Sequence, residues 1–293
     1  MQRQIECTLL NGPSTGCPWV KINGSIRDKP DVGLVQCTKC ELITHAIDLS
    51  AEVKYESGTM HNWASGYSDA LLPPIQDVER RLVALKELSK ASKKKLLDFG
   101  CGSGTMLSAL SGDFDTYGLE PDEDARLSAQ NSGHQVFSDT DEVLEQDLKF
   151  DFVTLFHVVE HFYEPSTEFE RIHRLLNPGG YLVIETPNSN DALISFYKNQ
   201  EFQNFTYWSH HPMLHSSKSL GAVAKGNGFK VIENSGVQRY GINNHLYWLA
   251  IGRPGGHEIW KSWISAEIEA LYEEMLVKKM ACDTLWLIAQ REG

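Results

Sequence analysis

Closely spaced glycines beside an acidic residue are the first feature of this sequence that could do chemistry. The segment KLLDFGCGSGTML, residues 95–107, places Asp98 just before Gly100, Gly102 and Gly104. Glycines at alternate positions permit a tight turn and let the backbone come close to a ligand. Leucines precede the turn and helically spaced apolar residues follow it, so the segment is expected to form a strand, a turn and a helix N-terminus. This order predicts a nucleotide-cofactor site in an α/β sheet.

A second acidic residue and a histidine-containing strand end extend this pattern. Glu120 follows a strand-like run at 116–119, at about the separation where an acidic residue meets a ribose diol in nucleotide-binding α/β folds. A third apolar run, 150–156, is followed at once by HVVEHF, which contains His157, Glu160 and His161. The carboxyl ends of strands in open α/β sheets are where ligands bind, so these side chains are expected at the site.

Together these motifs resemble the class I S-adenosylmethionine-dependent methyltransferases. The resemblance rests on LLDFGCGSGTML, GLEPDEDA, FDFVTLFHVVEHF and LLNPGGYLVIETPN, and it covers about residues 92–190. It implies an α/β fold, with a Rossmann-like, doubly wound, mostly parallel seven-stranded sheet and helices on both faces. A small N-terminal module and a helical C-terminal addition flank this core. The chain is most similar to the branch that acts on sugars and small metabolites, often in cell-surface polysaccharide or natural-product pathways.

The resemblance also implies which residues bind S-adenosyl-L-methionine. The three glycines admit the cofactor to the backbone, Asp98 meets its methionine end, and Glu120 holds the ribose hydroxyls by charge-assisted hydrogen bonds. In the family an acidic residue after the third strand receives the adenine amino group. Asp139 fits that role, and a solvated turn aspartate is the other interpretation. The predicted cofactor-binding set is Asp98, Gly100, Gly102, Gly104, Glu120, Asp139, Phe156 and His157.

Histidines are the candidates for the catalytic base, because their pKa lies near working pH. His161 is the first choice, since it lies nearest in sequence to the cofactor-facing strand end, and His211 lies where a substrate pocket is expected. His210, His215 and His245 are further candidates. Each of these histidines has a structural interpretation as well: the Glu160–His161 pair could simply begin the next helix.

Cysteines gather near the start of the chain and suggest a metal site. Cys37 and Cys40 form a C-x-x-C, the spacing at which a turn presents two thiolates to zinc. The phrase GLVQCTKCELIT resembles half of a zinc-binding module that precedes the catalytic domain in many sugar methyltransferases. The first half departs from that pattern, and Cys7 and Cys17 are its only available cysteines. A structural zinc on these four cysteines and a β-rich flap held by apolar packing are the two interpretations.

The pattern of apolar residues divides the chain into four parts. We predict a small cysteine-containing module at 1–47, a helical lid or linker at 48–94, the cofactor-binding core at 95–190, and the remaining core strands, a substrate-specific insertion and a C-terminal helix at 191–293. Helices are predicted at 75–88, 105–110, 122–131, 169–176, 217–226 and 262–280. Strands are predicted at 133–137, 152–156 and 181–185, with a turn at Pro178–Gly180 before the last of them.

Composition excludes several function classes. The net charge of −12 gives no broad attraction to nucleic acid. No run reaches the roughly 18 apolar residues of a membrane span, and the first residues lack a signal-peptide pattern. Cytoplasmic location is the default expectation, and cysteines there are thiols or metal ligands. The sequence leaves the oligomeric state open.

The resulting functional hypothesis is transfer of a methyl group from S-adenosylmethionine to a small molecule. Aromatic residues at 196–208 could stack on sugar faces while histidines and Asn243–Asn244 bind hydroxyls, so a sugar carried by a nucleotide or another carrier is the predicted acceptor. The same residues would suit a phenolic ring, and a quinone or phenol O-methyltransferase is the alternative. Two alternatives come from other classes: an NAD-linked oxidoreductase and a non-catalytic scaffold. The missing third glycine of G-x-G-x-x-G argues against the oxidoreductase.

Overall fold

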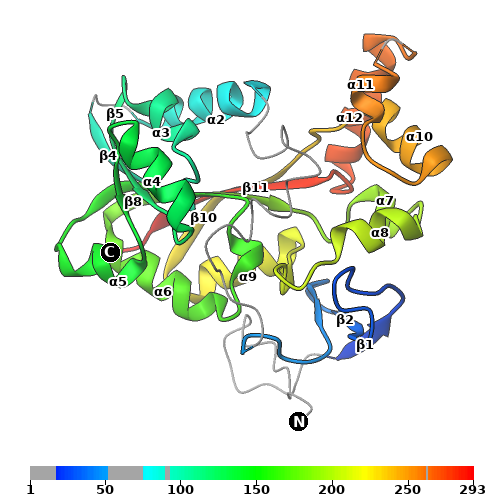
Figure 1. Ribbon diagram of the computed structural model, residues 1–293, viewed down its shortest axis with the longest axis horizontal. Coiled ribbons are helices and arrows are strands. Elements are labelled where there is room, and N and C mark those ends of the chain that lie inside the picture. The colour runs from blue at the N-terminus through cyan, green and yellow to red at the C-terminus, as the bar shows by residue number, and fades with distance from the viewer. Residues whose placement is uncertain (1–17, 52–74, 90–92, 262) are drawn as a thin grey trace.

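A mostly parallel sheet forms the centre of the molecule (Figure 1). The computed structural model describes residues 18–51, 75–89, 93–261 and 263–293. The seven strands lie in the order β10-β11-β8-β7-β4-β5-β6, and only β11 runs antiparallel to its neighbours β8 and β10. Their bounds are β4 Lys94–Phe99, β5 Phe114–Leu119, β6 Gln135–Phe137, β7 Phe150–Phe156, β8 Leu176–Pro187, β10 Phe229–Val237 and β11 Thr284–Arg291.

Helices cover both faces of this sheet because successive strand residues point to opposite sides. On one face Leu96 and Phe152 pack with α2 and α3; on the other, Leu97 and Val153 pack with α5, α6 and α9. The bounds are α2 Ile75–Leu88, α3 Thr105–Leu110, α4 Glu123–Asn131, α5 Thr140–Glu145, α6 Pro165–Leu175 and α9 Ser217–Gly226. The predicted three-layer, Rossmann-like α/β fold is therefore confirmed.

A second, smaller sheet joins the N-terminal module to a segment far along the chain. Its order is β1-β2-β3-β9, with bounds β1 Trp19–Ile22, β2 Leu34–Cys37, β3 Ile43–His45 and β9 Met213–Leu214. The pairing of β3 with β9 is antiparallel, Ile43 opposite Leu214. Ile26, Leu34 and Tyr207 contribute to a buried cluster beside this sheet. The module is thus tied directly to the chain that leads into α9.

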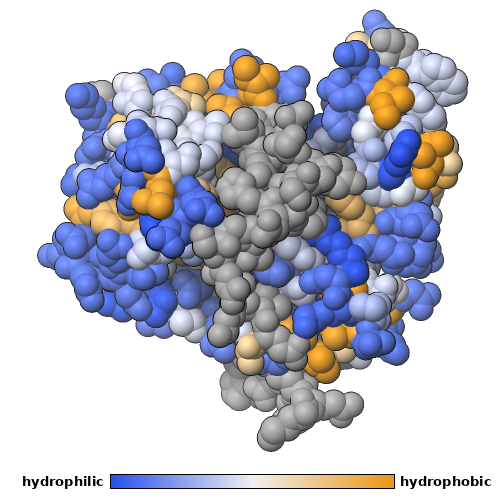
Figure 2. Space-filling view, in the orientation of Figure 1, coloured by the Kyte–Doolittle hydropathy of each residue, from blue (hydrophilic) through white to orange (hydrophobic). Residues whose placement is uncertain are grey.

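The C-terminal helices stand out from the sheet at the upper right of Figure 1. They are α10 Ile242–Ile251, α11 Gly256–Ile259 and α12 Ala266–Lys278, and the short helices α7 Ala192–Ser195 and α8 Gln200–Thr206 lie below them. Figure 2 shows orange, apolar surface in this region. Seven of the fourteen exposed large apolar side chains among the described residues lie here: Leu249, Ile251, Ile259, Trp263, Ile268, Leu271 and Met275. No helix in the described ranges is long and apolar enough to cross a membrane.

Two strands of the large sheet differ most from the sequence prediction. The turn predicted at Pro178–Gly180 lies inside β8, because Leu176 already pairs with Phe150 and the register shifts before Tyr181 meets Phe152. Gly179 has a φ of +76°, so the glycine forms an irregularity within the strand and does not end it. The strand β11 was missed, although its first six residues are all buried. The predicted helices at 75–88, 105–110 and 217–226 are confirmed at the same bounds.

Candidate active site

The glycine-rich turn between β4 and α3 has the conformation that its sequence predicts. Gly100, Gly102 and Gly104 have φ values of +76°, +55° and +88°, a region that side chains with a Cβ rarely adopt. A Cβ on Gly100 would come within 2.5 Å of Val158 Cγ2, so this glycine lets the β7 end pack against the turn. At Gly102 no atom among the described residues lies within 4 Å of the position of a Cβ. As far as the described residues go, the middle of the turn is therefore open to a ligand.

Asp98 is the penultimate residue of β4, and its carboxylate lies inside the protein. The side chain is 3% exposed and accepts a hydrogen bond of 2.7 Å from the Thr154 hydroxyl on the neighbouring strand β7. Burial raises the pKa of Asp98 to about 6, against the opposing effects of Thr154 and Arg81. A cationic or hydrogen-donating ligand would therefore stabilise the ionised form of this buried carboxylate.

Glu120, which follows β5, fastens the glycine-rich turn to the next strand. One of its oxygens accepts a hydrogen bond of 2.8 Å from the Gly102 N–H, and the other accepts one of 2.9 Å from the Asp122 N–H. Burial raises the pKa of Glu120 despite these bonds. The structure thus brings Asp98, the glycines and Glu120 to one sheet edge, as the sequence predicts.

Asp139 and Phe156 have clear structural roles. Asp139 follows β6 and is the N-cap of α5, where it accepts a hydrogen bond of 2.9 Å from the Glu142 N–H. This bond is the largest of the effects that lower the pKa of Asp139. The Phe156 ring stacks on Trp286 with centroids 6.2 Å apart, and the Arg81 guanidinium lies 4.4 Å from its centroid. The proposed cofactor contacts of both residues stay predictions.

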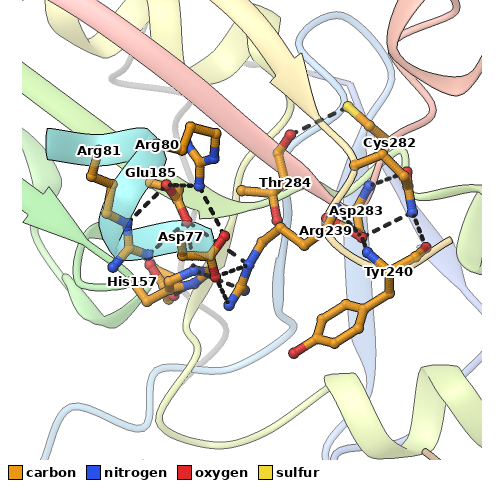
Figure 3. A network of polar contacts seen from close by, with 12 residues as sticks. Asp77, Arg80, Arg81, His157, Glu185, Arg239, Tyr240, Cys282, Asp283 and Thr284 are labelled. Carbon is orange, nitrogen blue, oxygen red and sulfur yellow. Dashed lines mark hydrogen bonds and ion pairs between the residues drawn. The ribbon is translucent and has the colours of Figure 1, made fainter. Parts of the chain in front are cut away.

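A buried ionic network connects α2 to the strand ends (Figure 3). Arg81 donates hydrogen bonds of 2.7 and 3.1 Å to the Glu185 carboxylate, and Arg80 donates another of 2.7 Å. Arg239 binds Asp77 at 2.6 and 2.8 Å. Hydrogen bonds to His157 and Arg81 outweigh burial and hold the pKa of Glu185 well below its usual value.

Sequence reasoning missed this network, although a signal was present. Glu185 ends the apolar run YLVIE, and a carboxylate buried at such a position needs a cationic partner. Arg80 and Arg81 on the predicted helix at 75–88 were candidates for it.

His157 joins that network to Glu160. The residue has a φ of +59°, which is uncommon for a residue with a Cβ. Its Nε2 lies 3.0 Å from an Arg239 nitrogen and 3.3 Å from Glu185, and its Nδ1 lies 3.5 Å from a Glu160 oxygen. Burial and Arg239 lower the pKa of His157, but hydrogen bonds to Glu160 and Glu185 outweigh them and raise it.

The structure brings the two predicted catalytic histidines together beside Glu160. His161 ends the 3-10 turn Val159–His161, and its ring lies 4.8 Å from that of His211, centroid to centroid. Its Nδ1 lies 2.7 Å from the His210 carbonyl oxygen, so Nδ1 carries the proton and donates it there. Glu160 is 1% exposed and accepts a hydrogen bond of 2.9 Å from the Thr186 hydroxyl. These three residues, Glu160–His161–His211, are called the acceptor-side cluster after the catalytic role that the sequence predicts for its histidines.

Burial sets the protonation states of this acceptor-side cluster. It lowers the pKa of His211 to about 3 and also lowers the pKa of His161, so both rings are neutral at physiological pH. Burial alone would raise the pKa of Glu160, but the hydrogen bond to His157 and the charge of that imidazole lower it to about 2. A carboxylate and two neutral imidazoles therefore face one another.

Residues from the N-terminal module hold the loop that carries His211. The Ser209 N–H donates a hydrogen bond of 3.0 Å to Asp28, and Arg27 donates one of 3.0 Å to the Phe205 carbonyl. His45 lies 3.1 Å from the Trp208 carbonyl oxygen. These contacts span more than 160 residues of chain, and no local sequence pattern predicts them.

His210 contacts the acceptor-side cluster through its carbonyl oxygen. His215, His245 and the predicted zinc cysteines do not belong to the cluster. His245 lies on α10, with Nδ1 2.8 Å from the Tyr272 hydroxyl, and burial lowers its pKa to about 4. His215 is fully buried, with Nδ1 3.1 Å from the Ser219 hydroxyl. Cys37 and Cys40 are buried in the small β-sheet module, whereas Cys7 and Cys17 lie outside the described residues. The zinc site stays a prediction.

Most aromatic side chains at 196–208 are used for packing. Tyr207 and Trp208 are buried, and Phe202 packs edge-on against Trp248 with centroids 5.1 Å apart. Phe196 is 76% exposed. The flat aromatic surface on which the sugar hypothesis depended is therefore largely committed to the protein interior.

Comparisons with known proteins agree with this geometry. A family model described as a methyltransferase domain matches residues 76–234, more than half of the chain. Ubiquinone biosynthesis O-methyltransferases of Pseudomonas syringae pv. tomato and Pseudomonas aeruginosa are 29% and 31% identical over 51% and 50% of this chain, and 68% and 66% of their own lengths.

Solved structures share the fold. A SAM-dependent methyltransferase from Archaeoglobus fulgidus has a TM-score of 0.52 at 19% identity, over 80% of this chain and 100% of that one. A chain from the complex of the Haloferax volcanii Trm112 methyltransferase activator with a methyltransferase has a TM-score of 0.51 at 18% identity, over 80% of this chain and 96% of that one.

Proposed function

The chain belongs to the methyltransferase-domain family and is an S-adenosylmethionine-dependent methyltransferase, and we propose that it methylates a hydroxyl group of a small phenol or quinol. The observation that carries this proposal is the acceptor-side cluster Glu160–His161–His211, which lies past the end of β7. Val158, between these residues and the strand, packs against the glycine-rich turn. The cluster and the cofactor-binding residues therefore share one edge of the sheet.

The residues at the other strand ends fit the cofactor. S-adenosylmethionine carries a cationic sulfonium, an ammonium group and a ribose diol. Asp98, with its raised pKa, gains from a nearby cation, and Glu120 offers carboxylate oxygens to hydroxyl donors. The open space at Gly102 admits a ligand to the backbone. The cofactor supplies an activated methyl group, so the protein must position the acceptor, exclude water and help its hydroxyl lose a proton.

Acceptor acidity favours a phenol over a sugar. A phenol has a pKa of about 10, as tyrosine does, whereas water, which approximates an alcohol, has a pKa of about 15.7. This difference of about 6 pKa units corresponds to about 8 kcal/mol. The imidazoles here are weak bases, because burial lowers the pKa of both. The curated relatives are named ubiquinone biosynthesis O-methyltransferases, which supports the phenol or quinol class over the sugar class.

A panel of acceptors tests this function. Catechols, simple phenols and nucleotide sugars are each incubated with S-adenosylmethionine, and release of S-adenosylhomocysteine is measured. We expect turnover of phenols, with a loss of about 100-fold or more in kcat for His161→Ala and an unchanged dissociation constant for S-adenosylmethionine. His173→Gln, on α6 against Phe229, is the control for loss of a histidine elsewhere. Turnover of nucleotide sugars alone would reject the phenol class.

A further inference from the structure

The acceptor-side cluster has the composition of a metal site. Glu160, His161 and His211 each offer one ligand atom, and these atoms all lie within 4.8 Å of one another. Among the described residues, no other group of three histidine, cysteine or carboxylate side chains meets this condition. We propose that the acceptor-side cluster binds one divalent transition-metal ion of the Zn²⁺ class, with two imidazoles and one carboxylate as ligands.

The surrounding contacts prepare the three side chains for this role. The Nδ1–H of His161 is bonded to the His210 carbonyl, which fixes the ring tautomer and leaves Nε2 unprotonated. The Thr186 hydroxyl orients Glu160 at 2.9 Å. Metal-ligating histidines and carboxylates usually have such partners, because they set the direction of the lone pairs.

His211 supplies an independent observation. Its Nδ1 is buried and has no hydrogen-bond partner among the described residues. A buried polar nitrogen without a hydrogen-bond partner destabilises the folded protein. Coordination to a cation would remove that destabilisation, because a neutral imidazole offers its lone pair to the metal.

The ligand set selects the kind of metal. Two imidazoles and a carboxylate form catalytic zinc sites and the facial triad of iron(II) enzymes, with further positions open to other ligands. Mg²⁺ prefers oxygen ligands in octahedral geometry, so two imidazole nitrogens are a poor match for it. Tetrahedral Zn²⁺ at about 2.0–2.2 Å from each donor places the donors about 3.3 Å apart. The atoms must therefore approach by about 1–2 Å, which rotation of two partly exposed imidazoles can provide.

This inference concerns the ligand of the acceptor-side cluster and is independent of the acceptor. With a metal bound, His161 and His211 act as ligands and not as the predicted base. An acceptor hydroxyl would then lose its proton more easily through the open metal positions. Methylation of phenols can succeed or fail separately from metal binding.

Titration of metal-free protein with Co²⁺ tests the proposal by absorption spectroscopy. We expect about one equivalent of Co²⁺ to give visible bands without a near-ultraviolet thiolate band, and Zn²⁺ but not Mg²⁺ to displace it. His211→Gln and Glu160→Gln should each weaken Co²⁺ binding by about 100-fold or more, since each removes a ligand directly. His245→Gln, which changes a buried histidine on α10, should leave Co²⁺ binding unchanged.

The cysteine-rich module is the competing metal site, and the double variant Cys37→Ser/Cys40→Ser separates the two. Bands that persist in this variant and disappear in His211→Gln support the proposal. A thiolate band lost with the cysteines, or no visible bands at all, overturns it. Thermal melting and S-adenosylmethionine titration establish that each variant is folded. A ligand variant that fails to fold is replaced by His161→Gln, for which the same loss is expected.

Discussion

The predicted cofactor side and the predicted acceptor side of the site are built in different ways. Asp98, the three glycines and Glu120 come from one short stretch of chain and meet because parallel strands place their carboxyl ends together. The acceptor-side cluster Glu160–His161–His211 joins the end of β7 to a loop that Asp28 and Arg27 hold from the N-terminal module. Local sequence thus determines the first side, whereas tertiary contacts determine the second.

The ionic network of α2 connects the two sides, and breaking it should have the largest effect. Arg81 is 3% exposed and pairs with Glu185, which is fully buried. Arg81→Met leaves that carboxylate with fewer cationic partners, so we expect a loss of about 3–5 kcal/mol in the free energy of unfolding. Denaturant titration measures it. Arg80→Met is the control: its side chain is 30% exposed, and its loss should cost less. Equal, small losses would show that the network is dispensable.

Glu120→Ala should damage the cofactor side selectively. Hydrogen bonds to charged groups contribute about 1.5–3 kcal/mol, so the dissociation constant for S-adenosylmethionine should rise about 10- to 150-fold. Calorimetric titration measures this change. Glu120→Gln keeps an acceptor oxygen for the Gly102 N–H and should lose less affinity for S-adenosylmethionine. An unchanged constant in folded Glu120→Ala would remove this residue from the cofactor site.

The pH dependence of S-adenosylmethionine binding tests whether Asp98 belongs to the cofactor site. Its pKa of about 6 means that the carboxylate ionises only above that pH. A cationic ligand favours the ionised form, so protons compete with it, and affinity should fall up to about tenfold for each pH unit below 6. In Asp98→Asn binding should be weaker and nearly independent of pH between 5 and 7. A wild-type affinity that is constant over this range would contradict the assignment.

The difference between local and tertiary contacts explains which features could be predicted from the sequence alone. The strand–turn–helix pattern at 95–107 and the acidic residue after the next strand predicted the placement of Asp98, Gly102 and Glu120. These positions depend on neighbours in the chain. The Arg81–Glu185 pair and the support of His211 by Asp28 join residues more than 100 apart, and local patterns carry no information on such contacts. The histidines were identified by residue type, but their meeting beside Glu160 required the fold.

Asp28→Asn should impair only the acceptor side. The change weakens the hydrogen bond between the N-terminal module and Ser209, which lies two residues before His211 in the same loop. A loss of about 1 kcal/mol in positioning corresponds to roughly a fivefold drop in kcat/KM for the acceptor, with S-adenosylmethionine binding unchanged. Steady-state kinetics with a phenol and calorimetry with the cofactor measure the two quantities. A parallel loss of cofactor affinity would show that the two sides are not independent.

Asp139 has an observed structural role as a helix cap and a predicted role in binding the adenine amino group, and the two can be measured separately. As N-cap of α5, it should contribute about 1 kcal/mol to stability, and Asp139→Ala should lose that amount. If its exposed carboxylate also receives the adenine amino group, the dissociation constant for S-adenosylmethionine should rise about fivefold. Asn199→Ala is the control, since Asn199 caps α8, away from the glycine-rich turn, through the Phe202 N–H at 2.8 Å. We expect both variants to lose similar stability and only Asp139→Ala to bind the cofactor more weakly; equal cofactor binding in the two would leave Asp139 as a helix cap alone.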